Sequence, residues 1–198
     1  MDRKKAILDA AAALFAERGF AATPTAEIAR RAGVAEGTIF HHFKNKDELL
    51  FNIVIDLFDA FIEGIKTAIA TPRNGLDAVE KALWFHLLFI EKKSSLVLVL
   101  VRDFPFKLLN VESPFSRELK TRAQRIHELF VECLERGRQD GSICPVSIQA
   151  TAIILRSLLT GYTRLKFLSP VPLPEMREEL IRFCRRSLTT STTNHEQP

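Results

Sequence analysis

The sequence predicts an all-α protein of two parts, and two observations support this fold class. Apolar residues recur with a period near 3.6 along most of the 198 residues, which is the repeat of an α-helix. Strand-like patterns are almost absent. The aliphatic run Leu96–Val101 has the composition of a buried strand, but no partner strand exists elsewhere, so we expect a buried helix. About nine helices follow one another, three short ones within residues 1–46 and about six longer ones within residues 47–188.

The first three helices are delimited by capping and turn residues. The first runs from Asp2 to Arg18, because Asp2 is suited to cap its start and Gly19 to follow its end. The second covers Thr25–Ala32 and the third Ala35–Phe43.

The longer helices are separated by Pro, Gly and Asn. Asn45 or Asp47 begins a fourth helix, and Thr71–Gly75 breaks the chain after it. Residues 104–114 form a connection punctuated by Pro, and residues 189–198 are rich in Thr, Asn and Gln, which predicts a disordered tail. The remaining helices are predicted over Leu76–Lys93, Leu96–Val101, Phe115–Arg136, Ser147–Leu168 and Pro174–Leu188.

Charge and cysteine content limit the possible function classes. The net charge is +4 and the pI about 9.1, which mildly favours a polyanionic partner. Residues 1–50 hold eight Lys/Arg and seven Asp/Glu, so charge alone does not predict DNA binding there. Three Cys without C-x-x-C spacing indicate reduced thiols inside a cell. No stretch has a signal core or the length of a membrane span, so we expect a cytoplasmic protein without membrane contact.

The stretch Thr25–Leu50 has the pattern of a helix-turn-helix. Ala29 and Ala32 are small enough for two helices to approach closely, and Gly33 can adopt the positive φ of the turn between them. Three apolar residues seat both helices on the first one: Ile28, Ile39 and Phe43.

The outward face of the third helix then carries short polar and aromatic groups. Such a face suits the major groove of DNA. Its members are Glu36, Gly37, Thr38, Phe40, His41 and His42.

On these residues the chain resembles the TetR family of transcriptional regulators. The resemblance runs from Thr25 to Leu49. One departure is Phe40, where Tyr is common, so that a phenol that often donates to phosphate is lost. The resemblance implies a helix-turn-helix DNA-binding domain over residues 1–46 and a helical effector-binding and dimerisation domain over residues 47–188. The matching segments are Ile28-Ala29, Ala32-Gly33-Val34, Gly37-Thr38-Ile39-Phe40, His42-Phe43 and Lys46.

The resemblance also implies roles in DNA binding. Thr25 would cap the second helix and donate to a phosphate, and Thr38 would contact a phosphate or a thymine methyl group. His41 and His42 would reach a base edge and a phosphate, in an order that the sequence leaves open. Lys46 would hold a phosphate and lock the DNA-binding domain to the second domain. The predicted DNA-binding residues are Thr25, Glu36, Gly37, Thr38, Phe40, His41, His42, Lys44 and Lys46.

Other chemistry is less well supported. Lys44 and Lys46 can also be solvated surface charges. The adjacent His41 and His42 lack the i, i+4 spacing that places two metal ligands on one helix face, so we predict no metal site. Residues 47–188 contain no catalytic constellation and no phosphate loop, so we predict no catalytic residues, no cofactor and no enzymatic activity.

Aromatic residues are dense after residue 50, where TetR-family members house an effector pocket. A small hydrophobic effector would suit such a lining. These side chains can equally form a solid core. His86 lies in an apolar helix and can either orient an effector or bond a backbone carbonyl. The predicted effector-binding residues are Phe61, Trp84, Phe85, His86, Phe89 and Phe104.

The last two predicted helices have the wide apolar surface of a dimer interface. A Gly within a helix costs roughly 1 kcal/mol relative to Ala, so Gly161 indicates a close approach of helices. TetR-family members pair these helices with those of a second copy, and packing within one chain is the alternative. The predicted interface residues are Leu155, Leu158, Gly161, Tyr162, Leu165, Leu180, Phe183 and Cys184.

The sequence therefore predicts a ligand-responsive repressor. We expect it to bind palindromic double-stranded operator DNA as a homodimer and to be released by a small apolar effector. Two alternatives are a helical ligand-binding protein or enzyme with an idle helix-turn-helix, and an interaction module whose helix-turn-helix contacts protein. The intact pattern from Thr25 to Lys46 argues against both, because an idle helix-turn-helix need not keep Thr38, His42 and Lys46.

Overall fold

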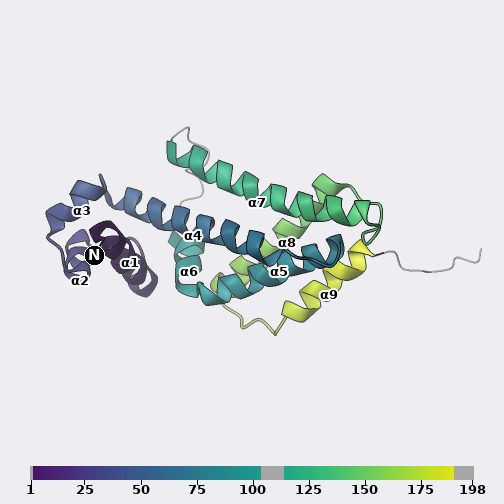
Figure 1. The fold of residues 1–198 in the computed structure, drawn as a ribbon. Helices are drawn as coiled ribbons and strands as arrows, with labels where there is room; N and C mark the ends of the chain where they lie inside the picture. The colour runs from purple at the N-terminus through teal and green to yellow at the C-terminus, as the bar shows by residue number, and fades with distance from the viewer. Residues whose placement is uncertain (1, 104–113, 190–198) are drawn as a thin grey trace, which may run out of the picture. The chain divides into compact units, whose positions relative to one another are not determined.

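The computed structural model describes residues 2–103 and 114–189, and over these residues the chain forms nine α-helices joined by turns and loops (Figure 1). The all-α prediction is confirmed, and the run Leu96–Val101 is helical. No helix in this described part is long and apolar enough to cross a membrane. The helices are α1 (Arg3–Arg18), α2 (Thr25–Ala32), α3 (Glu36–His42), α4 (Lys46–Ala68), α5 (Gly75–Lys92), α6 (Ser94–Asp103), α7 (Pro114–Gln139), α8 (Ile148–Leu168) and α9 (Arg177–Leu188).

The helix bounds differ most from prediction at α7 and α9. We expected Gly137 to follow the end of α7, but the helix continues to Gln139. A side chain on Gly137 would lie 2.3 Å from Ile143, so this glycine is required within the helix for close packing and not as its end. The left-handed turn falls instead at Gly141, with φ of 74°. The last helix begins at Arg177, three residues later than predicted from Pro174.

The described residues group into two compact units. The first combines Met1–Phe61 with Phe89–Ala123, and the second combines Ile62–Leu88 with Gln124–Pro198. Three helices, α4, α5 and α7, contribute residues to both units. These units are defined by which residues pack together, whereas the boundary predicted after residue 46 separates a DNA-binding domain from an effector-binding domain. That boundary stays a prediction.

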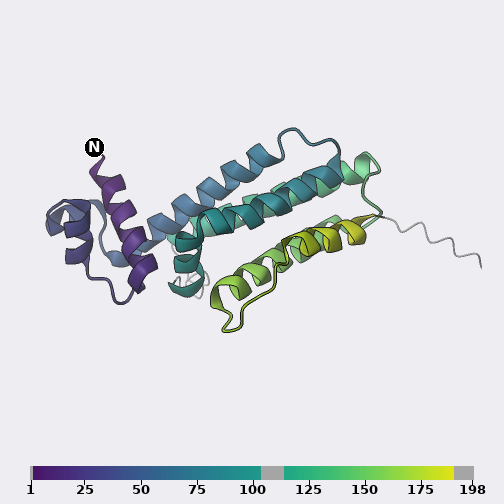
Figure 2. The ribbon, with the colours of Figure 1, turned by 90° about the horizontal axis from the view of Figure 1, so that it is seen from below.

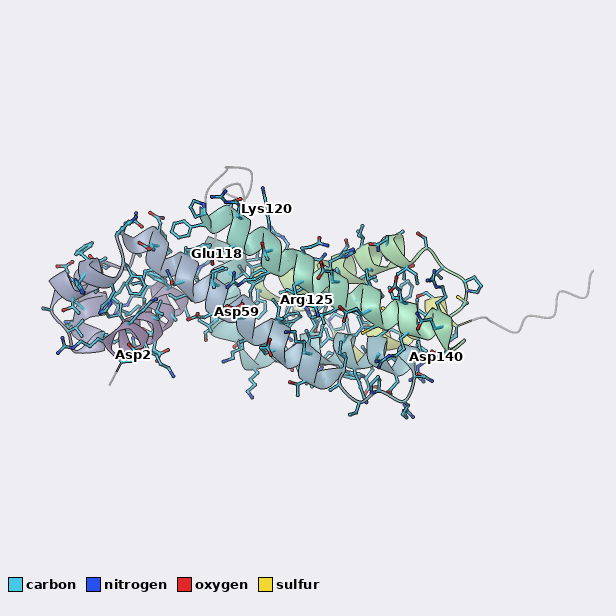
Figure 3. All side chains as sticks on the ribbon, turned by 45° about the horizontal axis from the view of Figure 1, so that its top comes forward. Asp2, Asp59, Glu118, Lys120, Arg125 and Asp140 are labelled. Carbon is cyan, nitrogen blue, oxygen red and sulfur yellow. The ribbon has the colours of Figure 1, made fainter. Side chains whose placement is uncertain are left out.

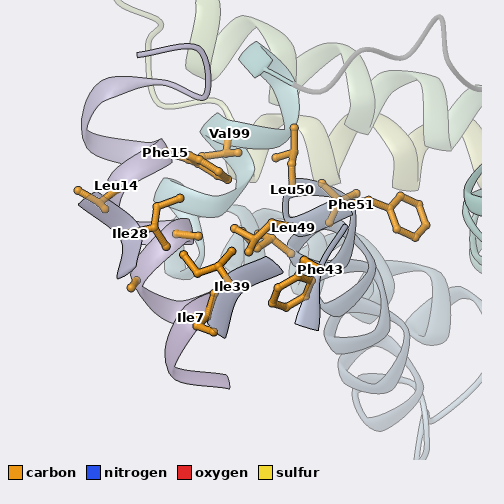
Figure 4. Close-up of a cluster of buried hydrophobic side chains, with 14 of the residues drawn as sticks. Ile7, Leu14, Phe15, Ile28, Ile39, Phe43, Leu49, Leu50, Phe51 and Val99 are labelled. Carbon is orange, nitrogen blue, oxygen red and sulfur yellow. The ribbon is translucent and has the colours of Figure 1, made fainter. Parts of the chain in front are cut away.

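The first unit is built around one apolar cluster (Figure 4). It joins one face of α1 to the start of α4 and to Val99 of α6, which is fully buried. At its ends, α1 is capped as predicted: the Asp2 carboxylate accepts from the Lys4 amide at 3.0 Å, and Gly19 adopts φ of 88°. The largest fully buried side chains of the cluster are Ile7, Leu14, Phe15, Ile28, Ile39, Phe43 and Leu49.

In the second unit, the start of α5 packs directly on the end of α7. A side chain on Gly75 would lie 1.9 Å from the Gly137 amide nitrogen, so the two backbones touch. The Asp140 carboxylate accepts from the Gly75 amide at 2.7 Å, and the Ser142 hydroxyl accepts from the Leu76 amide at 3.0 Å. These bonds satisfy the free N–H groups at the start of α5.

The same unit contains α8 and α9, which run side by side (Figures 1 and 2). Arg185 of α9 forms a bidentate ion pair with the buried carboxylate of Glu80 on α5, with Nη2 2.6 Å from Oε2. Cys144 donates its amide to the Leu188 carbonyl at 2.9 Å, which fixes the end of α9. The buried residues of the two helices are Ile148, Ala152, Leu155, Leu159, Tyr162, Ile181, Cys184 and Leu188.

Candidate functional site

The turn between α2 and α3 has the conformation predicted for a helix-turn-helix. Gly33 adopts φ of 68° and ψ of 34°, and no atom outside its immediate surroundings lies within 4 Å of the position that a Cβ would take. The glycine is therefore required for its left-handed backbone and not for space. The amide of Val34 donates to the Ala29 carbonyl at 3.0 Å and closes the turn.

The turn directs one side of α3 inward and the rest outward. Ile39 is buried, and Phe43 directly after the helix is buried as well. Phe40 is 51% exposed. The imidazoles of His41 and His42 are both exposed, with ring centroids 5.3 Å apart. The predicted DNA-contacting residues of α3 thus form one surface: Glu36, Gly37, Thr38, Phe40, His41 and His42.

Thr25 does not cap α2 with its side chain, in contrast to our expectation. The N-cap position is Pro24, which has no side-chain acceptor, and its carbonyl accepts from the amides of Glu27 and Ile28. The Thr25 hydroxyl donates instead to Oε1 of Glu36 at 2.6 Å. This bond joins the starts of α2 and α3 and gives the Glu36 carboxylate a partner on a surface that would face phosphates.

Lys46 makes contacts within the protein. Its ammonium group donates to the carbonyls of Phe20 and Thr23, at 2.9 and 3.1 Å, and lies 4.5 Å from the centroid of the Phe20 ring. It therefore holds the loop between α1 and α2 against the first turn of α4. By contrast, Lys44 is exposed, and its backbone amide donates to Glu48 at 2.7 Å.

The start of α4 is settled by a reciprocal cap. The Asn45 side chain accepts from the Glu48 amide at 2.8 Å, and the Glu48 carboxylate in turn accepts from the Lys44 amide. Of the two residues that the sequence left open, Asn45 rather than Asp47 begins the helix.

A second tie on the α1–α2 loop comes from α6 and was not predicted. The Arg102 guanidinium donates to the Phe15 carbonyl at 2.6 Å and pairs with Asp103 at 2.7 Å. Asp103 accepts from the Phe20 amide at 3.4 Å. The sequence indicated only that Arg102 and Asp103 pair with each other. Their contact with α1 spans more than eighty residues of sequence, and no local pattern reveals it.

The predicted effector-binding residues fall into both units. Phe61 and Phe89, in the first unit, are buried with their rings edge to face at 5.2 Å between centroids. Trp84, Phe85 and His86, in the second unit, are half-buried. Phe85 packs on the α4 backbone, because a Cβ on Gly64 would lie 2.3 Å from its ring. Phe104 lies outside the described residues.

His86 is neutral and hydrogen-bonded to a side chain. Its Nε2 lies 3.0 Å from the Thr163 hydroxyl, and that hydroxyl donates its own proton to the Leu159 carbonyl at 2.8 Å. The hydroxyl oxygen therefore accepts, and the His86 proton lies on Nε2. Burial lowers the pKa of His86 to about 4, so the ring is uncharged at neutral pH.

Two arginines of α7 form ion pairs within the protein, and two of the cysteines are buried. Arg122 bridges Asp59 at 2.8 Å and Glu118 at 3.4 Å (Figure 3 labels both carboxylates). Arg125 pairs with Glu128 and Glu132 at 3.2 and 2.7 Å. Burial raises the pKa of Cys133 to about 12 and that of Cys184 to about 11, which keeps both thiols protonated. Over the described ranges, no group of three His, Cys, Asp or Glu is placed to hold a metal ion.

The predicted interface residues divide between two faces of α8 and α9. Leu155, Tyr162 and Cys184 are buried within the single chain. The others lie outward or partly outward, because α8 and α9 each carry apolar residues well away from their buried faces. The most exposed of these side chains on the two helices are Ile153, Ile154, Leu165, Leu168 and Phe183, and the exposed apolar stripe of α8 consists of Ile154, Leu158, Gly161, Leu165 and Leu168.

Comparison with known proteins gives a consistent family and fold. Residues 7–53 match the family described as bacterial regulatory proteins, tetR family. The chain is 29% identical to the HTH-type transcriptional repressor KstR2 of Rhodococcus jostii over 140 residues. The aligned segment covers 71% of this chain and 67% of that protein. The structure of the regulator FadR from Bacillus subtilis in complex with stearoyl-CoA is similar with a TM-score of 0.76, at 18% identity over 93% of this chain and 99% of that chain. AibR in complex with isovaleryl coenzyme A and operator DNA is similar with a TM-score of 0.70, at 21% identity over 94% and 98%.

Proposed function

We propose that the chain, whose residues 7–53 match the tetR family of bacterial regulatory proteins, binds a palindromic operator as a homodimer and leaves it when a small effector binds. The single observation that carries the DNA-binding part is the α3 surface. Thr38, His41 and His42 lie on a short helix fixed by the left-handed turn at Gly33 and by the buried Ile39. Side chains on such a helix can reach base edges while the preceding helix lies along the backbone.

The test of DNA binding is a footprint on the DNA upstream of the chain's own gene. Protection of two half-sites, about 10 bp or a multiple of it between their centres, would agree with a dimer that places two α3 helices in successive major grooves. Protection of only one half-site would contradict the proposal, and so would the absence of protection on every DNA fragment tested. A scrambled duplex of equal composition serves as the control for non-specific binding.

The exposed stripe of α8 supports the homodimer. Ile154, Leu158 and Leu165 are 58%, 36% and 54% exposed, and Gly161 lies between the last two on the same side. A Cβ on Gly161 would meet nothing within 4 Å in its own chain, so the glycine leaves room for a partner helix. Phe183, which is 55% exposed, extends the apolar surface onto α9.

We infer that the effector is a molecule with an apolar part, and two observations support it. The structurally similar regulators FadR and AibR were solved with stearoyl-CoA and isovaleryl coenzyme A. In this chain, Trp84 and Phe85 are half-buried on one helix, which suits contact with an apolar group.

The loop between α1 and α2 offers a route from the effector to DNA. Lys46 of α4 and Arg102 of α6 both donate to carbonyls at or after the end of α1. A shift of either helix on effector binding would change the position of the helix-turn-helix. By linkage, an effector that weakens operator binding must itself bind less tightly to the DNA complex by the same factor.

A further inference from the structure

The helix α8 has three distinct faces. Its buried face carries Ala152, Leu155, Leu159 and Tyr162, and its exposed apolar stripe lies to one side of that face. Residues seven apart on an α-helix fall within about 20° of each other. Arg156 and Thr163 therefore share the third face, which lies on the other side of the buried one.

Thr163 identifies what this third face meets. Its hydroxyl accepts from His86 of α5 at 3.0 Å, so this side of α8 turns toward α5 and away from the exposed stripe. Arg156 lies two helical turns from Thr163 along the same face, about 10 Å away. It is half-buried, and it is the one charged residue between Ile154 and Leu158.

Arg156 differs from the other half-buried or interhelical arginines in its partners. Arg102, Arg122 and Arg185 each pair with a carboxylate at 2.8 Å or less. Among residues 2–103 and 114–189, the Arg156 guanidinium has no hydrogen-bond or ion-pair partner. Desolvation lowers its pKa, and no neighbouring charge offsets this. A guanidinium that is partly withdrawn from water without a counter-charge pays part of the cost of desolvation, and an anionic ligand would offset that cost.

We propose that Arg156 binds an anionic group of the effector, whose apolar part contacts the aromatic residues of α5. This inference rests on the proposed effector site and specifies it: the ligand is an amphipathic anion and not a neutral apolar molecule. The shared chemistry is an oxyanion that accepts two parallel bonds from a guanidinium. A carboxylate of a free fatty acid and a phosphate of a coenzyme A thioester both provide it. The neutral His86–Thr163 pair, with its proton on Nε2, adds no competing charge on this face.

The test uses Trp84, the single tryptophan of the chain, as an intrinsic fluorescent probe of ligand binding. Decanoate, decanoyl-CoA and neutral 1-decanol are titrated against the full-length protein. The variants are Arg156→Gln, which removes the charge, Arg156→Lys, which retains it, and Arg164→Gln, a matched control on the exposed surface of the same helix. We expect Arg156→Gln to weaken the anion that binds by about 10- to 100-fold and to leave 1-decanol within about twofold. Arg156→Lys should recover part of the loss, and Arg164→Gln should match the wild type.

The two anionic probes separate the sources of the charge. A response of decanoate alone to Arg156→Gln identifies a carboxylate, and a response of decanoyl-CoA alone identifies a phosphate. Equal binding of every probe by wild type and Arg156→Gln overturns the proposal, and so does a wild type that binds neither anion. Footprinting with the same preparations separates the role of Arg156 from the proposed function. A protein that binds DNA but no anion would reject the role of Arg156 and would still agree with DNA binding by the helix-turn-helix.

A second readout distinguishes a ligand-binding arginine from a structural one. If Arg156 serves to bind an anion, Arg156→Gln should keep or raise the Tm of the ligand-free protein, because an unpaired, half-buried charge is removed. Decanoate or decanoyl-CoA should then raise the Tm of the wild type more than that of the variant. A Tm of the ligand-free variant several degrees below the wild type would assign Arg156 a structural role and overturn the proposal.

Discussion

The helices α3 and α8 both face partners in this account, and they are built in opposite ways. In α3 a single buried residue, Ile39, anchors seven residues, and the rest of the helix is mostly polar and exposed, with Phe40 as an exposed aromatic side chain. In α8 one face is buried, a second is apolar and exposed, and a third holds a half-buried arginine. DNA is recognised by polar groups on a rigid support, whereas a second chain requires apolar area. The exposed face of each helix therefore suits the partner that we propose for it.

The largest expected effect comes from a charge placed in the exposed apolar stripe of α8. Leu165→Glu places a charge in the exposed stripe of α8, so we expect monomers and a loss of operator affinity on the order of 100-fold or more, because one half-site contact gives little specificity. Thr160→Glu is the matched control, since Thr160 is exposed on the same helix but away from the stripe. Sedimentation equilibrium measures the oligomeric state. A dimeric Leu165→Glu protein would show that the interface lies elsewhere.

A half-buried histidine of the second unit should make stability depend on pH. His86 has a pKa lowered to about 4, against an ordinary value near 6.5, so the unfolded chain binds its proton more readily. The free energy of unfolding contributed by this group is therefore complete above pH 6.5 and falls as the pH drops from 6.5 to 4, by about 3 kcal/mol at most. Urea unfolding at several pH values measures this. His86→Gln, which keeps a donor for Thr163, should reduce the loss, and an unchanged pH dependence would reject the assignment.

The next effect sharpens the account of the α3 surface. His41→Ala should cost about 1–3 kcal/mol on the operator and little on scrambled DNA, if this ring contacts a base edge. His42→Ala should then weaken both duplexes to a similar extent, because a phosphate contact carries no sequence information. Fluorescence anisotropy titrations on both duplexes give the comparison. The reverse result would exchange the two roles, and equal losses for both variants would remove base reading from this pair.

The smallest effect separates two lysines that lie two residues apart. Lys46→Ala breaks the bonds to Phe20 and Thr23, so we expect the free energy of unfolding to fall by about 1–2 kcal/mol. Lys44→Ala should leave stability within about 0.5 kcal/mol and lower the salt slope of DNA binding by about 1 per subunit. Thermal unfolding and a salt series measure the two quantities. A Lys46→Ala variant that is as stable as the wild type and has a reduced salt slope of DNA binding would indicate that Lys46 contacts a phosphate.

The sequence predicted the frame of the DNA-binding part well, because that frame depends on local requirements. A positive φ at Gly33 and a cap at Asp2 follow from residue chemistry and neighbours only. The helical state of Leu96–Val101 followed from the absence of a partner strand. What the sequence did not predict there was side-chain pairing: Thr25 bonds Glu36, and Lys46 bonds two carbonyls, because these contacts depend on where other helices end.

In the rest of the chain, the sequence predicted helices but not the function of their faces. The interface prediction combined exposed residues such as Leu165 with Leu155 and Tyr162, which are buried, because helical spacing alone does not say which side meets the rest of the chain. Arg156 had a signal, a charge within a mostly apolar stretch. Its significance depends on the neighbour that Thr163 meets, 77 residues away in sequence.

The measurement that tests the central claim most directly is the affinity for the upstream operator and for a scrambled duplex of equal composition, at several salt concentrations. The account predicts that the operator is bound at least about 1,000-fold more tightly at physiological salt, with the slope against salt expected of phosphate contacts. Equal affinity for the two duplexes at every salt concentration would contradict it, because the α3 surface would then read no sequence.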